Sequence, residues 1–156
     1  EKQHKLKAII TQNIDMLHQR AGSAVPIYEL HGSPITAKCL KCNQKYSRAE
    51  LLNKMNSESI PKCNLCKGLI KPNVVLFFEE LPSDAVYGAI TAVQNCDCLL
   101  MIGSSLLVAP ANQVPFFAKE SGAKIIFINF EPTLFDEIAD ACLLGKAGDI
   151  LPKIVE

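Results

Sequence analysis

The sequence predicts an α/β fold in which a parallel sheet is interrupted by a small metal-binding module. Three short apolar runs, at 74–77, 98–102 and 124–128, lack strict alternation, as expected of strands covered on both faces. The segments 83–94 and 110–122 between them carry helix signals. Strand, helix, strand, helix, strand is the order of a parallel sheet with right-handed crossovers.

The first expected strand covers 6–10, an apolar run followed by polar residues at 11–13. A buried strand of this kind delivers polar side chains at its carboxyl end. We expect a short helix next, with Asp15 as its N-cap and Gly22 as its C-terminal stop.

The later helices are predicted from residues that suit helix ends. Ser47 and Glu50 have the spacing of a capping box, which indicates a helix inside the cysteine-rich segment. Ser83 can cap the helix that follows it. The helix at 110–122 begins with a proline, which suits a first helical position, but Pro115 should disturb it because proline lacks an N–H donor.

The composition is that of a globular chain with no overall charge. Hydrophobic residues make up 49% of the 156 residues, enough for one domain core and a small appended module. Sixteen basic residues balance sixteen acidic ones, so we expect neither nucleic acid nor an anionic membrane as a partner. The apolar runs are far shorter than the roughly 20 residues that span a bilayer.

The cysteines indicate a reducing compartment. Seven cysteines, four of them in two close pairs, suit metal binding better than a secreted disulfide framework. No secretory signal is visible near residue 1, so we expect a cytoplasmic location. Because 6–15 has the pattern of the middle of a fold, we also expect the natural N-terminus to lie further upstream.

Two C-x2-C pairs separated by twenty residues predict a zinc site with four thiolate ligands. Four thiolates complete the tetrahedral coordination of zinc and leave no position for water, so such a site is structural and not catalytic. An iron–sulfur cluster and four unrelated buried thiols are the alternatives, and the regular spacing favours zinc. The predicted ligands are Cys39, Cys42, Cys63 and Cys66.

Three polar clusters follow apolar strands, at 12–15, 103–105 and 129–131. Ligands of an open α/β sheet bind at the carboxyl ends of the strands, so we expect the clusters to line one crevice. Gly103 would let the backbone approach a phosphate closely, and Asn129 or Glu131 can bond ribose hydroxyls.

His31 is the candidate for proton transfer. It follows the apolar stretch 25–30, and Gly32 should leave its imidazole room on one side. A lone histidine is more often structural than catalytic. The motifs around it change that expectation.

These motifs resemble those of the sirtuin family of NAD-dependent protein lysine deacylases, and the similarity extends over nearly the whole sequence. In chain order they are Thr-Gln-Asn-Ile-Asp (11–15), Leu-His (17–18), Arg-Ala-Gly-Ser (20–23), Glu-Leu-His-Gly-Ser (29–33), the two cysteine pairs, Lys-Pro-Asn-Val-Val (71–75), Gly-Ser-Ser-Leu (103–106), Pro-Ala (110–111), Asn-x-Glu-Pro-Thr (129–133) and the tail at 145–152.

The resemblance implies a Rossmann-like parallel sheet with helices on both faces, incomplete at the N-terminus, plus a small zinc-ribbon module. Residues 1–35 would supply the nicotinamide-pocket strand and the catalytic histidine loop. Residues 36–72 would form the zinc module, and 73–156 would supply the peptide-binding strand and the adenosine site.

The resemblance also implies acyl transfer from lysine to ADP-ribose with release of nicotinamide. His31 would act as general base on the ribose of the nicotinamide half of NAD, after the acyl oxygen has displaced nicotinamide at C1′; an imidazole that titrates near neutrality suits this task. Asn13 and Asp15 would form the nicotinamide pocket. The full implied NAD set is Gln12, Asn13, Asp15, Gly103, Ser104, Ser105, Asn129, Glu131, Lys146 and Ala147.

The implied partner is a protein or peptide with an acylated lysine, bound as an added strand with little sequence preference. We expect no membrane and no direct nucleic-acid contact, and the oligomeric state stays open. The residues implied to contact the peptide are Val75, Phe77, Phe78, Glu79, Val108 and Pro110.

The chain departs from the family pattern in two ways. Met16 and Phe78 stand where the family usually has glycine, and a phenylalanine at a position that needs positive φ would strain or narrow the peptide groove. The family's Gly-Ala-Gly-x-Ser phosphate loop and its flexible Gly-Ile-Pro-Asp-Phe-Arg segment do not occur in these 156 residues. We therefore expect a fragment or a truncated reading frame that binds NAD weakly or not at all on its own.

Two other functions remain open from the sequence. The same cleavage of NAD could pass ADP-ribose to another nucleophile, which would make the chain a protein ADP-ribosyltransferase. The chain could instead be a zinc-stabilised module that keeps a peptide groove but has no catalytic activity.

Overall fold

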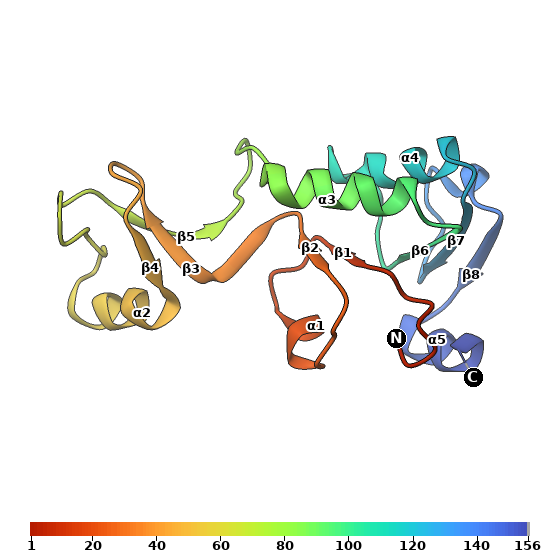
Figure 1. The fold of residues 1–156 in the computed structure, drawn as a ribbon, viewed down its shortest axis with the longest axis horizontal. Helices are drawn as coiled ribbons and strands as arrows, with labels where there is room; N and C mark the ends of the chain where they lie inside the picture. The colour runs from red at the N-terminus through yellow and green to blue at the C-terminus, as the bar shows by residue number, and fades with distance from the viewer. Residues whose placement is uncertain (156) are drawn as a thin grey trace. The chain divides into compact units, whose positions relative to one another are not determined.

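The computed structural model describes residues 1–155 and divides the chain into two compact units. The first unit holds Ile9–Ala85 together with Glu1, and the second holds Lys2–Ala8 and the chain from Val86 onward. Figure 1 shows the elements of each unit with their labels. Among the described residues, no helix is long and apolar enough to cross a membrane.

The first unit begins with two short parallel strands, β1 (Ile9–Thr11) and β2 (Ile27–Glu29). The helix α1 (Leu17–Arg20) lies between them in the chain, as Figure 1 shows. The strand expected at 6–10 therefore exists, but it starts three residues later and includes the buried Thr11. Its carboxyl end leads into the polar cluster at 12–15, as predicted.

The helix α1 begins differently from the prediction but ends as predicted. Met16 occupies the N-cap position with φ 61° and makes no side-chain cap. Asp15 lies one residue earlier, where its Oδ1 accepts the N–H of Leu17 at 2.9 Å. The carboxylate thus bonds a free N–H of the first turn without being the N-cap. Gly22, at φ 77°, ends the helix in the left-handed conformation that glycine favours.

The same unit contains a three-stranded antiparallel sheet in the order β4-β3-β5. Its strands are β3 (Gly32–Cys39), β4 (Lys45–Ser47) and β5 (Ile70–Val74), and the helix α2 (Arg48–Ser57) follows β4. The predicted capping box is present at the start of α2. The buried core of this sheet consists of Ala37, Cys39, Tyr46, Leu51, Cys63 and Ile70.

The prediction of a parallel strand at 74–77 is wrong. The strand in this region is β5, which ends at Val74 and runs antiparallel to β3. After Val75 the chain turns, because the Glu79 carboxylate accepts the N–H of Leu76 at 2.8 Å and so closes the segment on itself. A run of apolar side chains does not distinguish a strand from an apolar turn with exposed side chains.

The second unit contains the parallel sheet, in the order β6-β7-β8. Two of its strands were predicted, and their bounds are Cys98–Ile102 for β6 and Lys124–Asn129 for β7. The third, β8 (Ala141–Leu144), and the helix α5 (Ala147–Val155) were not predicted. The middle of β7 is the centre of the core, with Ile125, Phe127 and Ile128 almost fully buried.

Helices cover this sheet on both sides. The helix α4 (Val114–Glu120) packs on β6 and β7, and α5 packs on β7. Figure 1 shows α4 and α5 on opposite sides of the three strands. The expected α/β class with a parallel sheet between helices is confirmed.

Of the two helices predicted before β6 and β7, the first is present as expected and the second is divided. The helix α3 (Ser83–Gln94) has the expected bounds. The single helix expected at 110–122 is instead a 3₁₀ turn, Ala111–Gln113, followed by α4. Proline has no N–H to donate, so Pro115 fits only in the first turn of an α-helix, and α4 begins directly before it.

Candidate functional site

The two cysteine pairs come together in the first unit. The Sγ atoms of Cys39, Cys42, Cys63 and Cys66 all lie within 4.8 Å of one another, and the Sγ–Sγ distances Cys39–Cys66 and Cys42–Cys63 are 3.5 and 3.6 Å. A tetrahedral zinc ion with Zn–S bonds of about 2.3 Å would separate its sulfurs by about 3.8 Å. The four thiols therefore have the identity and spacing that a metal with four sulfur ligands requires.

The backbone closes tightly around these sulfurs. The N–H of Lys41 donates to the Cys39 Sγ at 3.4 Å, as expected for a thiolate ligand. Gly68 passes so close that an added Cβ would lie 3.0 Å from the Cys39 Sγ and 3.3 Å from the Cys66 Sγ. A side chain at 68 would push into the sulfur cluster, so only glycine fits there.

Tyr46 supports the cluster and was not identified from the sequence. Its side chain is buried, its hydroxyl donates to the Cys63 Sγ at 3.0 Å, and the same oxygen accepts the N–H of Asn64 at 3.1 Å. The hydrogen bond from Tyr46 lowers the pKa of the Cys63 thiol and so favours the thiolate. No periodicity marks a tyrosine four residues after the second cysteine; only the β4–β3 pairing places it there.

His31 lies directly after β2 and is fixed by one ring nitrogen. Its Nδ1 lies 2.8 Å from the carbonyl oxygen of Gln12, and a carbonyl only accepts, so Nδ1 carries the proton. The neutral ring therefore has its lone pair on Nε2, which is the atom able to take a proton. The structure thus brings His31 to the loop that holds the first polar cluster.

Gly32 has a role beyond the one expected from the sequence. A Cβ at this position would lie 2.0 Å from the Asn73 carbonyl oxygen, and the backbone has φ 72°. Glycine is therefore required here because β5 passes close to β3.

The three polar residues before α1 lie on one loop. Gln12 is half-buried, while Asn13 and Asp15 are exposed. The N–H of Asn13 donates to the Thr11 hydroxyl at 3.1 Å, which fixes the chain as it leaves β1. Met16 follows at φ 61°, so the backbone keeps the left-handed conformation at a position where the sequence has no glycine.

In the second unit the carboxyl ends of all three parallel strands meet. Asn129, at the end of β7, is buried; its Oδ1 accepts the N–H of Ser104 and its Nδ2 donates to the Ser104 carbonyl, both at 3.0 Å. The N–H of Gly145, just after β8, donates to the Asn129 carbonyl at 2.8 Å. One amide side chain therefore ties the Gly103–Ser105 loop to the end of β7.

The other residues predicted to bind NAD in this unit come just after the three strands in the sequence. Gly103 has φ 63° and open space where a Cβ would point, which leaves its backbone accessible. Ser105, Glu131 and Lys146 are exposed, and Ala147 is half-buried at the start of α5. Exposed polar groups at the carboxyl ends of parallel strands are the usual place for a ligand of an α/β sheet.

Four of the six residues expected to bind a peptide, Val75, Phe77, Phe78 and Glu79, belong to a turn in the first unit. Val75 is half-buried, and its N–H donates to the His31 carbonyl at 2.8 Å. The side chains of Phe77 and Phe78 are 89% and 107% exposed, and Phe78 has φ 70°. Val108 and Pro110, of the second unit, are also exposed.

Lys71 holds this turn and was assigned no role from the sequence. Its Nζ donates to the Val74 carbonyl and forms an ion pair with the Glu79 carboxylate, both at 2.6 Å. The hydrogen bond from Lys71 lowers the pKa of the Glu79 carboxyl. The pair spans eight residues, so neither helical nor strand periodicity would have indicated it.

Comparison with known proteins agrees with these features. The model of the family described as Sir2 matches residues 1–110. The NAD-dependent protein deacylase 2 of Archaeoglobus fulgidus is 49% identical over 97% of this chain and 60% of the relative. The NAD-dependent protein deacetylase 1 of Pyrobaculum aerophilum is 45% identical over 100% of this chain and 61% of the relative.

A solved structure described as Sir2-p53 peptide-NAD+ superposes with a TM-score of 0.90 at 38% identity. The match covers 96% of this chain and 62% of that one. The present chain thus spans about three fifths of the length of the proteins it resembles.

Proposed function

Because this chain belongs to the Sir2 family, we propose that it is part of an NAD-dependent protein lysine deacylase, which transfers the acyl group of a modified lysine to ADP-ribose and releases nicotinamide. The observation that carries the proposal is the hydrogen bond of His31 Nδ1 to the Gln12 carbonyl. It leaves Nε2 free as a base beside the polar loop at 12–15.

The proposed chemistry divides between the co-substrate and this chain. NAD, when bound, supplies a ribose carbon from which the acyl oxygen displaces nicotinamide. His31 takes a proton at Nε2 from a ribose hydroxyl, and the Gln12 carbonyl holds the ring in the tautomer that permits this. Asn13 and Asp15 form the nicotinamide pocket.

The second unit would hold the adenosine half of NAD. We assign the phosphates and a ribose to the loop of Gly103, Ser104 and Ser105, because its backbone is open to close approach. Asn129 orients that loop through its two hydrogen bonds to Ser104. Glu131 binds the adenosine ribose, and Lys146 with Ala147 contacts the edge of the adenine.

We further propose that 1–35 and 73–156 belong to one NAD-binding domain and that 36–72 is a zinc module inserted into it. Zinc suits the four sulfurs because their spacing matches tetrahedral coordination. With four protein ligands the ion has no place for water, so it stabilises the module. A cytoplasmic location fits this set of reduced thiols.

The proposed substrate is a peptide segment with an acylated lysine. Relatives bound to such peptides support this class, for example the structure described as Sir2 bound to acetylated peptide. The residues that we propose to contact its backbone are Val75, Phe77, Phe78, Glu79, Val108 and Pro110.

Mass spectrometry of an acetyl-lysine peptide incubated with NAD and this chain tests the proposal. Loss of the acetyl group together with nicotinamide release supports deacylation. His31→Gln should abolish the loss of the acetyl group, because His31 acts after nicotinamide has been displaced. Gain of ADP-ribose by the peptide would instead make the chain an ADP-ribosyltransferase.

Titration calorimetry separates a lack of cofactor binding from a lack of chemistry. We expect weak heats with NAD for the 156-residue chain, since the sequence lacks the family's Gly-Ala-Gly-x-Ser loop. A chain that binds the acetylated peptide but no NAD, even at the highest concentration used, would act as a peptide-binding module and contradict the proposal for the chain alone.

A further inference from the structure

The charges of the chain balance in number but not in position. Residues 36–72 contain eight of the sixteen Lys and Arg residues but two of the sixteen Asp and Glu residues, which gives this module a net charge of +6. The remainder of the chain carries −6. The neutrality of the whole sequence therefore hides a strongly basic module.

The sulfur cluster accounts for only part of this charge. A zinc ion with four thiolates would carry a charge of about −2, so most of the positive charge of the module would remain uncompensated. A basic patch of this strength attracts acidic partners and raises their rate of association.

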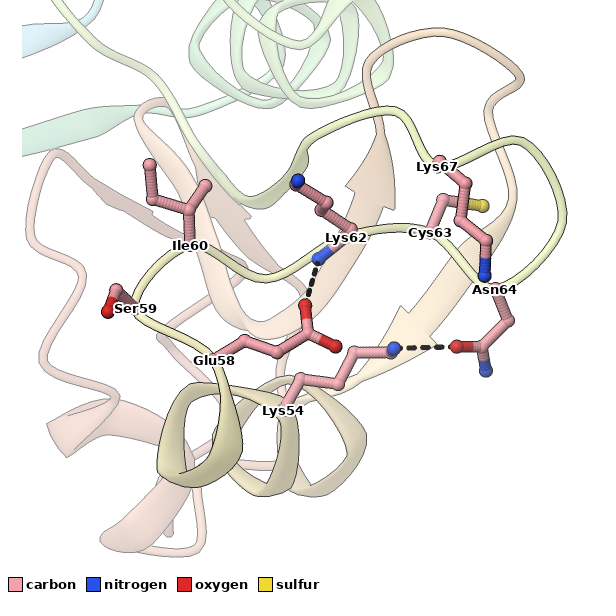
Figure 2. Close-up of a pocket in the computed structure, with 8 residues that line it drawn as sticks. All are labelled: Lys54, Glu58, Ser59, Ile60, Lys62, Cys63, Asn64 and Lys67. Atoms are coloured by element: carbon pink, nitrogen blue, oxygen red, sulfur yellow. Dashed lines mark hydrogen bonds between the residues drawn. The ribbon is translucent and has the colours of Figure 1, made fainter.

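Part of the positive charge is gathered around one hollow of the module surface. The hollow has a volume of about 550 Å³ and lies between the C-terminal end of α2 and the loop that follows it (Figure 2). Its charged and polar lining consists of Lys54, Glu58, Ser59, Lys62, Asn64 and Lys67. The lining thus contains three lysines and one glutamate.

The lining is held in place by contacts within the module. The Nζ of Lys54 donates to the Asn64 Oδ1 at 2.6 Å (Figure 2). The N–H of Asn64 donates to the buried Tyr46 hydroxyl. The Glu58 carboxylate already accepts the N–H of Lys62 at 3.1 Å, which occupies one of its oxygens. The loop is therefore anchored to the sulfur cluster, and Lys62 and Lys67 project from an ordered backbone.

We propose that this hollow is a docking site for an acidic polypeptide segment, one in which Asp and Glu carboxylates meet Lys54, Lys62 and Lys67. The interaction would recruit a partner protein by charge, independently of the acyl-lysine chemistry. Lysine ammonium groups donate to single carboxylates without the planar geometry that arginine imposes.

The lining favours an acidic polypeptide over nucleic acid. The described residues that line the hollow include no aromatic ring on which a base could stack and no arginine for bidentate phosphate contacts. Glu58 lies among the lysines and would repel a continuous phosphate backbone. Carboxylates on a flexible segment can be placed around it.

The test measures fluorescence anisotropy with the zinc-loaded 156-residue chain and a short labelled peptide rich in Glu and Asp. The probe contains no lysine, so its binding does not depend on deacylation or on NAD. We expect saturable binding at about 50 mM salt that weakens clearly by about 200 mM. The same peptide with Gln and Asn in place of its acidic residues should not bind.

Two charge-reversal variants locate the site. The triple variant Lys54→Glu, Lys62→Glu, Lys67→Glu should weaken binding by at least about tenfold, because attraction becomes repulsion. The matched control Lys2→Glu, Lys5→Glu, Lys153→Glu changes three exposed lysines outside the module and should keep the affinity within about twofold. The double variant Lys62→Glu, Lys67→Glu keeps the bond of Lys54 to Asn64 and guards against a folding defect; zinc content is measured for each.

Four results would overturn the proposal. They are equal binding of the acidic and amide peptides, an equal effect of the module and control variants, preferential binding of a DNA duplex of equal charge, and absence of any binding at low salt.

Discussion

Phe78 combines an unfavourable backbone conformation with a fully exposed aromatic ring. A non-glycine residue in the left-handed region costs about 1–2 kcal/mol, and the exposed side chain gains little packing in return. The resemblance to the sirtuin family implies that relatives usually have glycine at this position. The structure keeps the positive φ that a glycine would adopt freely.

We therefore predict that Phe78→Gly raises the free energy of unfolding by about 0.5–1 kcal/mol, after the larger entropy loss of glycine is subtracted. Urea unfolding followed by circular dichroism measures the change. The neighbouring Phe77, which is similarly exposed but has no positive φ, provides the control, and Phe77→Gly should destabilise. Equal changes in the two variants would contradict the strain at Phe78.

Tyr46 contacts the sulfur cluster through a single hydrogen bond, to Cys63. Replacing it with phenylalanine keeps the buried ring but removes the donor to the Cys63 sulfur and leaves the N–H of Asn64 without its partner. Outer partners of this kind typically change metal affinity by about 10–100-fold.

We predict that Tyr46→Phe releases zinc to a colorimetric chelator about tenfold more readily than the parent chain. Tyr87→Phe, at an exposed tyrosine of α3, is the control and should behave as the parent. Unchanged release from Tyr46→Phe would mean that the hydroxyl contributes nothing to metal retention.

At the scale of elements, Asp140 joins three pieces of the second unit. Its Oδ2 accepts the N–H of Ile125 and its Oδ1 accepts the Lys124 Nζ, both at 2.9 Å, and Lys119 of α4 lies 3.6 Å away. The backbone N–H of Ile125 and the neighbouring lysines hold the pKa of the Asp140 carboxyl at about 2. The start of β8 is thereby fixed to the start of β7.

Asp140→Asn should lower the stability of the chain near neutral pH. Because the pKa of Asp140 is depressed in the folded state, the contribution of its charge is complete above the unfolded value of about 4 and disappears as the pH falls through about 2. The deficit of the variant, measured by urea unfolding at several pH values, should shrink over this range. Glu137→Gln, at an exposed carboxylate, is the control, and a deficit independent of pH would contradict the charge effect.

Elements were predicted well where a local signal sets their ends. The capping box fixed the start of α2, and α3 has the bounds expected from its first serine. The strand expected at 74–77 failed because its end depends on the ion pair of Lys71 with Glu79, which no local pattern encodes. The strand β8 escaped notice because its apolar sequence, Ala-Cys-Leu-Leu, is only four residues long, and a run this short does not by itself indicate a strand.

At the scale of the whole molecule, the sulfur cluster should govern the first unit alone. Cys39 and Cys63 belong to the buried core of the antiparallel sheet. Removal of zinc would leave four thiolates that repel one another and would disrupt this core. The parallel sheet of the second unit has its own core around β7.

We predict that a chelator increases amide hydrogen exchange in β3, β4, β5 and α2 and leaves β6 and β7 protected. Mass spectrometry of peptic peptides measures both regions in one sample, and zinc added back should restore the protection. Equal loss of protection in both regions would contradict independent units.

From the sequence we could identify the four cysteines that the structure brings together, the candidate base and the polar ends of the strands, because each depends on residue identity and short spacing. The two C-x2-C pairs were sufficient to predict that the four sulfurs lie together. Four features became visible only in the folded structure: which His31 nitrogen is free, the hydrogen bond of Tyr46 to the Cys63 sulfur, the closure of the 75–79 turn by Lys71, and the three lysines around one hollow of a neutral chain. These features join residues far apart in the chain, and only the packing of the strands brings such residues within hydrogen-bonding distance.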